Sequence, residues 1–327
     1  MNRRKAELAL LFNACLWGAT FVLVKGALRE ISPVLFLAIR FSLATVALAA
    51  LFGGKWKRKY GDRRICPRGG EGTPPFHEGP ERLGTDSSAS AFSAPHATGK
   101  MLAAGSMIGV FLFAGFLLQT VGLKSTTAPK SAFLTSLATV MVPLLAALVY
   151  KIKPRISEVA GVLAATLGMG LMTFEGPIGS MGRGDLLTFG GAVAFAAHIV
   201  ATGHYAEQIG YEVLSVTQIG VAALSALSLV YWVEMPRIHW QPVVVWAILI
   251  TGLLCTALAF TIQAWAQRYT TSTRTALIYA LEPVVAWITS FSIAGEGLSG
   301  QAAAGAALIL SGVLLVEMKP FEPRQHL

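Results

Sequence analysis

The sequence predicts an all-α membrane protein with ten transmembrane helices, arranged as two inverted five-helix repeats. Three observations lead to this fold class. First, the 327 residues are 54% hydrophobic and only 13% charged, roughly half the charged fraction of soluble globular domains. Second, the chain contains ten long apolar runs. Third, its second half repeats the first half at a fixed offset.

Each of the ten apolar runs is long enough to cross the hydrocarbon core of a bilayer, which is roughly 30 Å thick. Lipid offers no partner for exposed backbone groups, so the runs must form helices or a closed barrel. Strands of about ten residues with alternating polarity are missing from the sequence, which favours helices. The expected spans are residues 8–28, 33–52, 102–122, 131–150, 156–174, 186–206, 213–233, 242–266, 275–294 and 301–317.

The orientation of these spans follows from their flanking charges. The first run is longer than the apolar region of a signal peptide, so we expect it to be retained as a helix. Basic residues are enriched on the cytoplasmic side of a membrane. With the start of the chain inside, the cytoplasmic segments hold 19 lysines and arginines and the external segments hold 6. We therefore expect both termini in the cytoplasm.

A shift of 144 residues aligns the two halves of the chain. Matches between small apolar residues alone would be weak, but glutamines, threonine pairs and basic residues match as well. Phe116, Gln119, Thr126, Thr127, Leu137, Gly161 and Gly168 fall on Phe260, Gln263, Thr270, Thr271, Leu281, Gly305 and Gly312, while Lys124 and Lys130 fall on Arg268 and Arg274. Five spans in each repeat invert the second copy, and inverted repeats are typical of secondary transporters.

The repeats divide the chain into residues 1–174 and 175–327. The first two spans match spans six and seven at a shift near 180 residues, so the first repeat must hold an insertion. This insertion belongs in the polar stretch at about 53–100, whose Gly-, Pro- and Ser-rich composition predicts a disordered cytoplasmic segment. An artefact at the level of the gene is the alternative.

Ionisable side chains within spans are costly, which makes each of them a candidate site residue. Glu282 lies well inside span nine, and Pro283 removes a backbone donor beside it. Its carboxylate could bind a substrate amine or carry a coupling proton, or it could form a structural hydrogen bond. Arg40, in span two, could bind a substrate carboxylate, or it could extend outward to water or pair with Glu30.

Five further residues complete the predicted substrate site. Trp17 and Tyr279 could form apolar walls with polar tips, although packing explains them equally well. Gln119 and Gln263 match between the repeats, which indicates either a shared polar site or a shared hydrogen bond between helices. His198 could handle a proton, with a packing role as the alternative.

Several classes of function find no support in the sequence. Cys15, Cys66 and Cys255 lack the spacing of a disulfide-built domain, a metal site or a redox motif, and we expect no metal or cofactor. No nucleophile and base form a recognisable constellation, so we do not expect an enzyme. The net charge of +9 lies largely on loops that determine topology, and we expect no nucleic-acid partner.

Several short motifs occur in a fixed order along the chain. They are Leu16-Trp17-Gly18 in span one, Pro33 and Arg40 in span two, residues 131–137 (SAFLTSL) in span four, residues 276–284 (ALIYALEPV) in span nine and the glycine-spaced closing helix from Gly305 to Glu317. In these residues the chain resembles the drug/metabolite transporter superfamily, in particular the EamA-like ten-helix transporters. It departs from them at residues 151–154 (KIKP), where related chains often carry an acidic residue, and in the 53–100 insertion.

The resemblance implies a secondary active transporter of small metabolites in the bacterial inner (plasma) membrane. Export of amino acids, related metabolites or drugs is expected, driven by protons or by exchange. The implied partners are a small-molecule substrate and the lipid bilayer, and formation of a homodimer stays open. The alternative is a non-transporting scaffold or lipid-interacting protein of the same fold, for which Glu282, Arg40 and Tyr279 would be dispensable.

Overall fold

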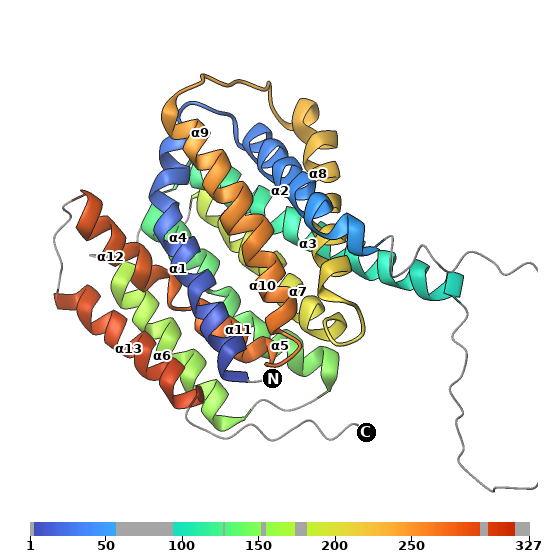
Figure 1. Cartoon of the computed structure of the whole chain (residues 1–327). Helices are drawn as coiled ribbons and strands as arrows, with labels where there is room; N and C mark the ends of the chain where they lie inside the picture. The colour runs from blue at the N-terminus through green and yellow to red at the C-terminus, as the bar shows by residue number, and fades with distance from the viewer. Residues whose placement is uncertain are drawn as a thin grey trace, which may run out of the picture.

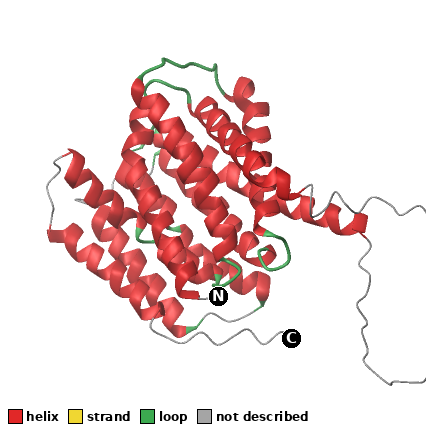
Figure 2. Ribbon diagram, in the orientation of Figure 1, coloured by secondary structure: helices red, strands yellow, loops and turns green. Residues whose placement is uncertain are grey.

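A computed structural model of the chain describes residues 3–56, 94–126, 128–151, 155–173, 182–294 and 300–317. In these ranges the backbone is helical apart from turns and one isolated antiparallel bridge, Ile31 to Ile238 (Figure 2). Most of the expected insertion at 53–100 lies outside the described residues, as does the expected boundary between the repeats at 174–175. Helices occupy all ten positions that the sequence predicts.

The helices follow one another along the chain (Figure 1). The first half contains α1 (Arg3–Ala27), α2 (Pro33–Trp56), α3 (Ala94–Leu123), α4 (Ala128–Ser136), α5 (Ala138–Tyr150) and α6 (Ile156–Thr173). The second half contains α7 (Arg183–Tyr205), α8 (Tyr211–Val233), α9 (Pro242–Leu249), the π-helical segment η2 (Ile250–Leu258), α10 (Ala259–Ala266), α11 (Ser272–Tyr279), α12 (Glu282–Ala294) and α13 (Gly300–Glu317).

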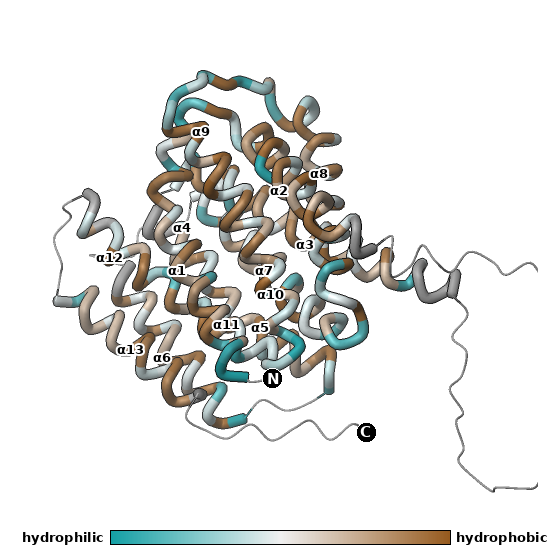
Figure 3. Tube along the Cα trace, in the orientation of Figure 1, coloured by the Kyte–Doolittle hydropathy of each residue, from teal (hydrophilic) through white to brown (hydrophobic). Residues whose placement is uncertain are grey.

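The lengths and composition of the helices fit a bilayer. Within the described ranges, seven stretches are long and apolar enough to cross a membrane, and α6 and α13 are shorter apolar helices. Each of these two has 18 residues, which corresponds to about 27 Å at 1.5 Å per residue. Apolar residues run along the helices, and polar residues gather at helix ends and connections (Figure 3). This is the architecture of an all-α multi-pass membrane protein.

Three of the predicted spans are not the continuous helices that their apolar patterns indicated. Span four breaks at Leu137, between α4 and α5, and span nine breaks at Ala280 and Leu281, between α11 and α12. Leu137 and Leu281 are matched by the 144-residue shift. Pro283 explains part of the second break because it cannot donate to the carbonyl of Tyr279. Span eight widens into the π-helical segment η2 at its centre.

Two groups of helices lie on either side of a central group. In Figure 1, α6, α12 and α13 lie on the left, while α2, α3 and α8 lie on the right. α2 packs on α8, and α3 packs on both α7 and α8. α1 runs between the two groups and contacts α12 on one side and α9, η2 and α10 on the other. The predicted site residues come mostly from these central helices.

Hydrogen bonds join the α1–α2 turn to the α8–α9 connection at the upper end of the bundle in Figure 1. The amide of Ser32 donates to the carbonyl of Arg237 (2.9 Å), and the amide of His239 donates to the carbonyl of Glu30 (2.8 Å). Glu234 Oε1 accepts hydrogen bonds from two amides in the first turn of α2. These contacts fix the start of α2, seven residues before Arg40.

α6 and α13 approach each other closely at glycines. A methyl group on Gly168 would lie 2.5 Å from the carbonyl oxygen of Gly305, and one on Gly312 would lie 2.6 Å from that of Gly161. The 144-residue shift pairs Gly161 with Gly305 and Gly168 with Gly312, so the same contact occurs twice with the helices exchanged. Small residues of this kind allow backbones to pack without intervening side chains.

This close approach yields a stability prediction. Gly168→Ala should force α6 and α13 apart and destabilise the protein by about 1–3 kcal/mol, as overpacking commonly does. Gly170→Ala on the same helix is the matched control, because its nearest atom would lie 3.9 Å away. Thermal unfolding of the purified proteins in detergent measures both. Equal unfolding temperatures for the two variants would contradict this account of the packing.

Candidate functional site

A cavity of about 120 Å³ lies at the centre of the bundle. Its size is similar to that of engineered protein cavities of roughly 150 Å³ that take up benzene, so it suits a small molecule. Among the described residues, nine helices contribute to its wall. The lining residues are Trp17, Thr20, Phe21, Val24, Arg40, Phe116, Gln119, Thr120, Leu123, Thr135, Ser136, Ala138, Thr139, Phe195, His198, Ile199, Phe260, Gln263, Ala276, Tyr279 and Glu282.

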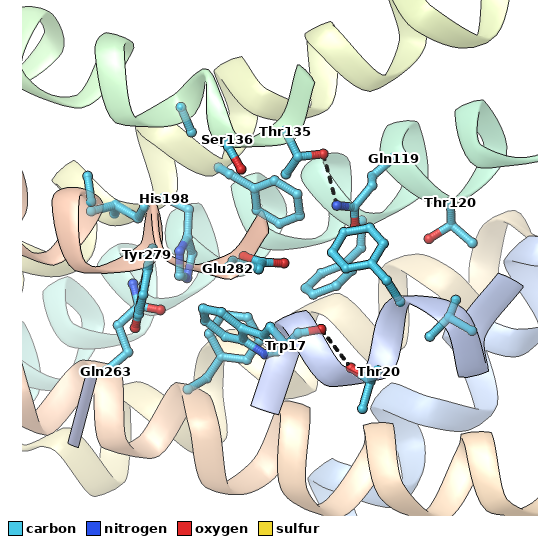
Figure 4. A pocket seen from close by; sticks show the side chains of 18 of the residues that line it. Trp17, Thr20, Gln119, Thr120, Thr135, Ser136, His198, Gln263, Tyr279 and Glu282 are labelled. Carbon is cyan, nitrogen blue, oxygen red and sulfur yellow. Dashed lines mark hydrogen bonds between the residues drawn. The ribbon is translucent and has the colours of Figure 1, made fainter. Parts of the chain in front are cut away.

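All the residues that the sequence analysis singled out for substrate binding line this one cavity. They come from α1, α2, α3, α7, α10, α11 and α12, and they lie far apart in the sequence. In Figure 4 the carboxylate of Glu282 lies between a group formed by His198 and Tyr279 and a second group formed by Gln119 and Thr135. The fold therefore brings the predicted polar residues together, although their role in binding stays a prediction.

Both interrupted helices break at the cavity wall. Thr135 and Ser136 line it at the end of α4, and Ala138 and Thr139 line it at the start of α5. On the other side, Tyr279 ends α11 and Glu282 begins α12. Leu137 and Ala280 keep right-handed helical φ and ψ angles, so each break is a local distortion of the helix and not an unwound segment. The two breaks mark this cavity as the place where the chain departs from a simple bundle.

Glu282 begins α12 at the cavity. Within the described part of the chain its carboxylate makes no hydrogen bond or ion pair, so the structural hydrogen bond considered as an alternative is not formed there. Gly18 allows α1 to approach this point, because a methyl group at Gly18 would lie 2.6 Å from the carbonyl oxygen of Glu282. The close approach places the cavity-lining residues of α1 beside the break in span nine.

Arg40 is buried, with 4% of its surface exposed. Its Nε donates to Thr256 Oγ1 (2.6 Å), and its guanidinium carbon lies 4.4 Å from the ring centroid of Phe116, a cation–π contact. The side chain thus does not extend outward to water. It also does not pair with Glu30, which lies 3.6 Å from His239 instead. Both structural alternatives for Arg40 were therefore wrong.

An aromatic group forms one wall of the cavity. The ring of Trp17 lies 4.8 Å from that of Tyr279 and 5.3 Å from that of Phe260. Trp17 Nε1 donates to the carbonyl oxygen of Cys255 (2.9 Å) in the π-helical segment, which fixes the orientation of the indole. Tyr279 accepts a long hydrogen bond from the Asn13 amide (3.5 Å). These rings give the cavity an apolar surface with few polar tips.

The remaining predicted residues have side-chain partners. Gln119 donates to Thr135 Oγ1 (3.0 Å), and Gln263 donates to Gln267 Oε1 (3.1 Å). The two matched glutamines thus do not bond to each other. His198 Nε2 lies 2.9 Å from Gln218 Oε1. In the described ranges, no group of three or more His, Cys, Asp or Glu side chains is arranged to hold a metal ion.

Comparison with known proteins identifies the family. The EamA-like transporter family matches residues 4–66, 89–174 and 182–318. The chain belongs to this family. An uncharacterized transporter from Archaeoglobus fulgidus is 30% identical over 98% of this chain and 88% of its own length. The uncharacterized transporter YyaM from Bacillus subtilis is 28% identical over 64% of this chain and 70% of its own length.

The comparison with solved structures shows the fold. One crystal structure aligns with 96% of this EamA-like chain and 97% of its own, with a TM-score of 0.69 at 20% sequence identity. The family resemblance seen in the sequence motifs is confirmed. The protein is a membrane transporter and not an enzyme.

Several lining residues of this EamA-like transporter were not predicted. Hydroxyl groups of Thr20, Thr135, Ser136 and Thr139 surround the cavity, but threonine and serine are too common in apolar helices to stand out. Phe116 and Phe260 could have been found, because the 144-residue shift matches them and each lies three residues before a predicted glutamine. Asn13 was not predicted either; it lies outside the set of lining residues but is buried and donates to the hydroxyl of Tyr279, which lines the cavity.

The contact of Arg40 with Thr256 yields a second prediction. Thr256→Val keeps the shape of the side chain but removes the hydrogen-bond acceptor of a buried charge, so the protein should lose about 1–3 kcal/mol of stability. Thr261→Val is the matched control, because its hydroxyl donates only to the carbonyl of Ala257 (2.6 Å) in its own helix. Thermal unfolding in detergent distinguishes the two. A larger loss in Thr261→Val would contradict this role of Thr256.

Proposed function

We propose that this EamA-like protein is a secondary active transporter that exports small zwitterionic metabolites, amino acids foremost, across the bacterial inner membrane. One observation carries the proposal. A cavity inside the bundle lies where two interrupted helices meet, and it holds a carboxylate and a guanidinium that form no ion pair with another described residue. Secondary transporters bind substrate at such helix interruptions near the middle of the membrane.

The two charged groups define the ends of the substrate. Glu282 can receive an ammonium group. Arg40 uses Nε for Thr256, which leaves its two terminal nitrogens, without partners among the described residues, to bind a carboxylate in a bidentate manner. A substrate that carries both groups would satisfy both side chains at once. A substrate with a single charge would leave one buried charge without a partner, which is costly.

The remaining wall suits the rest of an amino acid. The rings of Trp17, Phe116 and Phe260 offer apolar contact. The hydroxyl groups around the cavity offer adaptable hydrogen bonds to a polar side chain. Mostly apolar pockets with a few well-placed polar groups are typical sites for small molecules.

Two inverted repeats, residues 1–174 and 175–327 with ten spans in total, are part of the proposal. The paired breaks at Leu137 and Leu281 support it, as does the exchange-symmetric glycine contact of α6 with α13. The helix contacts agree with the repeat, which relates span three to span eight, span one to span six and span two to span seven. α3 of span three packs on α7 of span six, and α10 of span eight packs on α1 of span one. In the same way α3 packs on α8 of span seven, and η2 of span eight packs on α2 of span two. Two equivalent halves around one site provide the two gates that alternating access requires.

The topology completes the proposal. The bias of 19 to 6 basic residues supports a topology with both termini in the cytoplasm, in which the end of the bundle where α1 begins, at the bottom of Figure 1, would face the cytoplasm. Glu282 can bind either a proton or a substrate ammonium group, which would couple proton entry to substrate exit. Exchange of one substrate for another is the alternative source of energy.

A transport experiment tests this function. Purified protein reconstituted into liposomes should take up members of a labelled amino-acid pool, and an imposed pH gradient should drive their accumulation. Glu282→Gln should abolish accumulation that depends on the gradient. Glu30→Gln is the matched control, because this carboxylate lies outside the cavity, near His239. Absence of transport by folded protein would favour the scaffold alternative.

Substrate analogues test the two charged ends separately. The amine that lacks the carboxylate should bind about ten- to a hundredfold more weakly than the amino acid, because a hydrogen bond to a charged group is worth about 1.5–3 kcal/mol. In Arg40→Gln this difference should largely disappear. Likewise, the acid that lacks the amine should bind more weakly than the amino acid, and this difference should largely disappear in Glu282→Gln. Competition against the labelled substrate measures the affinities, and unchanged discrimination in both variants would refute the assignment.

A further inference from the structure

At the lower end of the bundle, an ion pair joins α1 to α11. Glu7 Oε1 lies 3.5 Å from Arg274 Nη1, and their side chains are only 13% and 5% exposed. Glu7 also contacts Arg3 Nε, one turn earlier in α1, at 2.5 Å. The pair therefore connects two helices that both line the cavity.

An apolar layer separates this ion pair from the cavity. Leu10 and Ala14 of α1 pack there with Ile278 and Tyr279 of α11, together with residues of α5 and α7. Tyr279 itself lines the cavity. A substrate path toward the lower end between α1 and α11 would separate Glu7 from Arg274.

At the upper end, a different contact holds the same helix. Lys25 Nζ, in the last turn of α1, donates to the carbonyl oxygen of Thr126 (2.7 Å) and reaches that of Leu123 (3.5 Å). Thr126 Oγ1 donates to Asp185 Oδ1 in the first turn of α7 (2.6 Å). Val24 and Leu123 line the cavity, so the Lys25 contact lies beside the part of the cavity between α1 and α3.

We infer that Glu7 and Arg274 form the lower gate of the cavity, that Lys25 and the carbonyl of Thr126 form the upper gate, and that α1 releases one contact at a time. This inference rests on the proposed transport function and adds the residues that control access. α1 carries both gates 18 residues apart, about 27 Å along the helix axis. Trp17 lies between them in the cavity wall, so a tilt of α1 changes both gates and the site together.

The repeat relates an acidic residue at the lower end of the bundle to one at the upper end. The shift near 180 that relates the first spans of the repeats, taken as 178, places Glu7 on Asp185. Each acidic residue lies near the start of its helix and contacts the segment that precedes or begins an interrupted span. For Glu7 this is Arg274 of α11, and for Asp185 it is Thr126, just before α4. Such equivalence is expected of gates that open alternately.

Thiol labelling tests the gates without any substrate. In protein with Cys15, Cys66 and Cys255 replaced by serine, Ser136→Cys places a reporter in the cavity wall. A membrane-impermeant maleimide is applied to vesicles of either orientation. Glu7→Gln should raise the labelling rate from the lower side about three- to tenfold and lower it from the upper side, because the population moves toward the state open below. Lys25→Met should do the reverse.

Control variants distinguish the loss of a gate contact from a general loosening of the helix bundle. Arg3→Gln removes the contact of Glu7 within α1, and Arg29→Met removes a cation one turn beyond Lys25, so neither should shift the labelling. The double variant Glu7→Gln with Arg274→Gln should equal either single variant, as expected for one shared contact. Equal increases from both sides, additive effects, or shifts in the two control variants would overturn the inference.

The labelling also separates this inference from the proposed function. If the gate variants shift labelling of the reporter cysteine in opposite directions but no amino acid is transported, the gate assignment stands and the proposed substrate class is refuted. Amino-acid transport by all gate variants with unchanged labelling on both sides would refute the gates and keep the substrate class. Size-exclusion profiles and unfolding temperatures of each variant ensure that only folded protein is compared.

Discussion

The cost of leaving polar groups unsatisfied in a bilayer governs this structure. Lipid offers no hydrogen bonds, so continuous helices are the default for any segment that crosses it. The chain departs from continuous helix at Leu137, at Ala280–Leu281 and through η2, and two of these departures border one cavity while η2 supplies the partners of Arg40 and Trp17. The irregular backbone, the buried charges and the cavity therefore occur together, and each lowers the energetic cost of the others.

Close backbone contacts hold that arrangement together. Gly18 brings α1 against the start of α12, and Gly252 brings η2 against the α2 segment that carries Arg40. In both places a glycine stands where a larger side chain would separate a site residue from the opposite wall. Packing of small residues, which in a membrane protein replaces much of the hydrophobic driving force between helices, thus also sets the geometry of the site.

Helices occupy the positions of all ten spans that the sequence predicted, and all the site residues it named line the cavity, because apolar length and isolated polar residues are strong signals in a membrane chain. The sequence did not predict the π-helical segment or the acceptor of Arg40. Thr256 is one of many threonines, and a wide helical turn leaves no mark in an apolar pattern. For Arg40, the sequence analysis considered structural partners only close to it in the sequence or in the water outside the bundle. The actual partner, Thr256, lies 216 residues away.

The two halves carry different side chains where they meet at the cavity. The 144-residue shift places Ala138 on Glu282 and Thr135 on Tyr279, so the matched breaks carry different side chains. Arg40 similarly has an uncharged counterpart near Gln218, which binds His198. Matched backbones would serve the two gates proposed above, whereas the proposed zwitterionic substrate has unlike ends and would need unlike partners. A repeated scaffold with unrepeated side chains meets both demands, because access depends on how helices pack and recognition depends on which residues face the cavity.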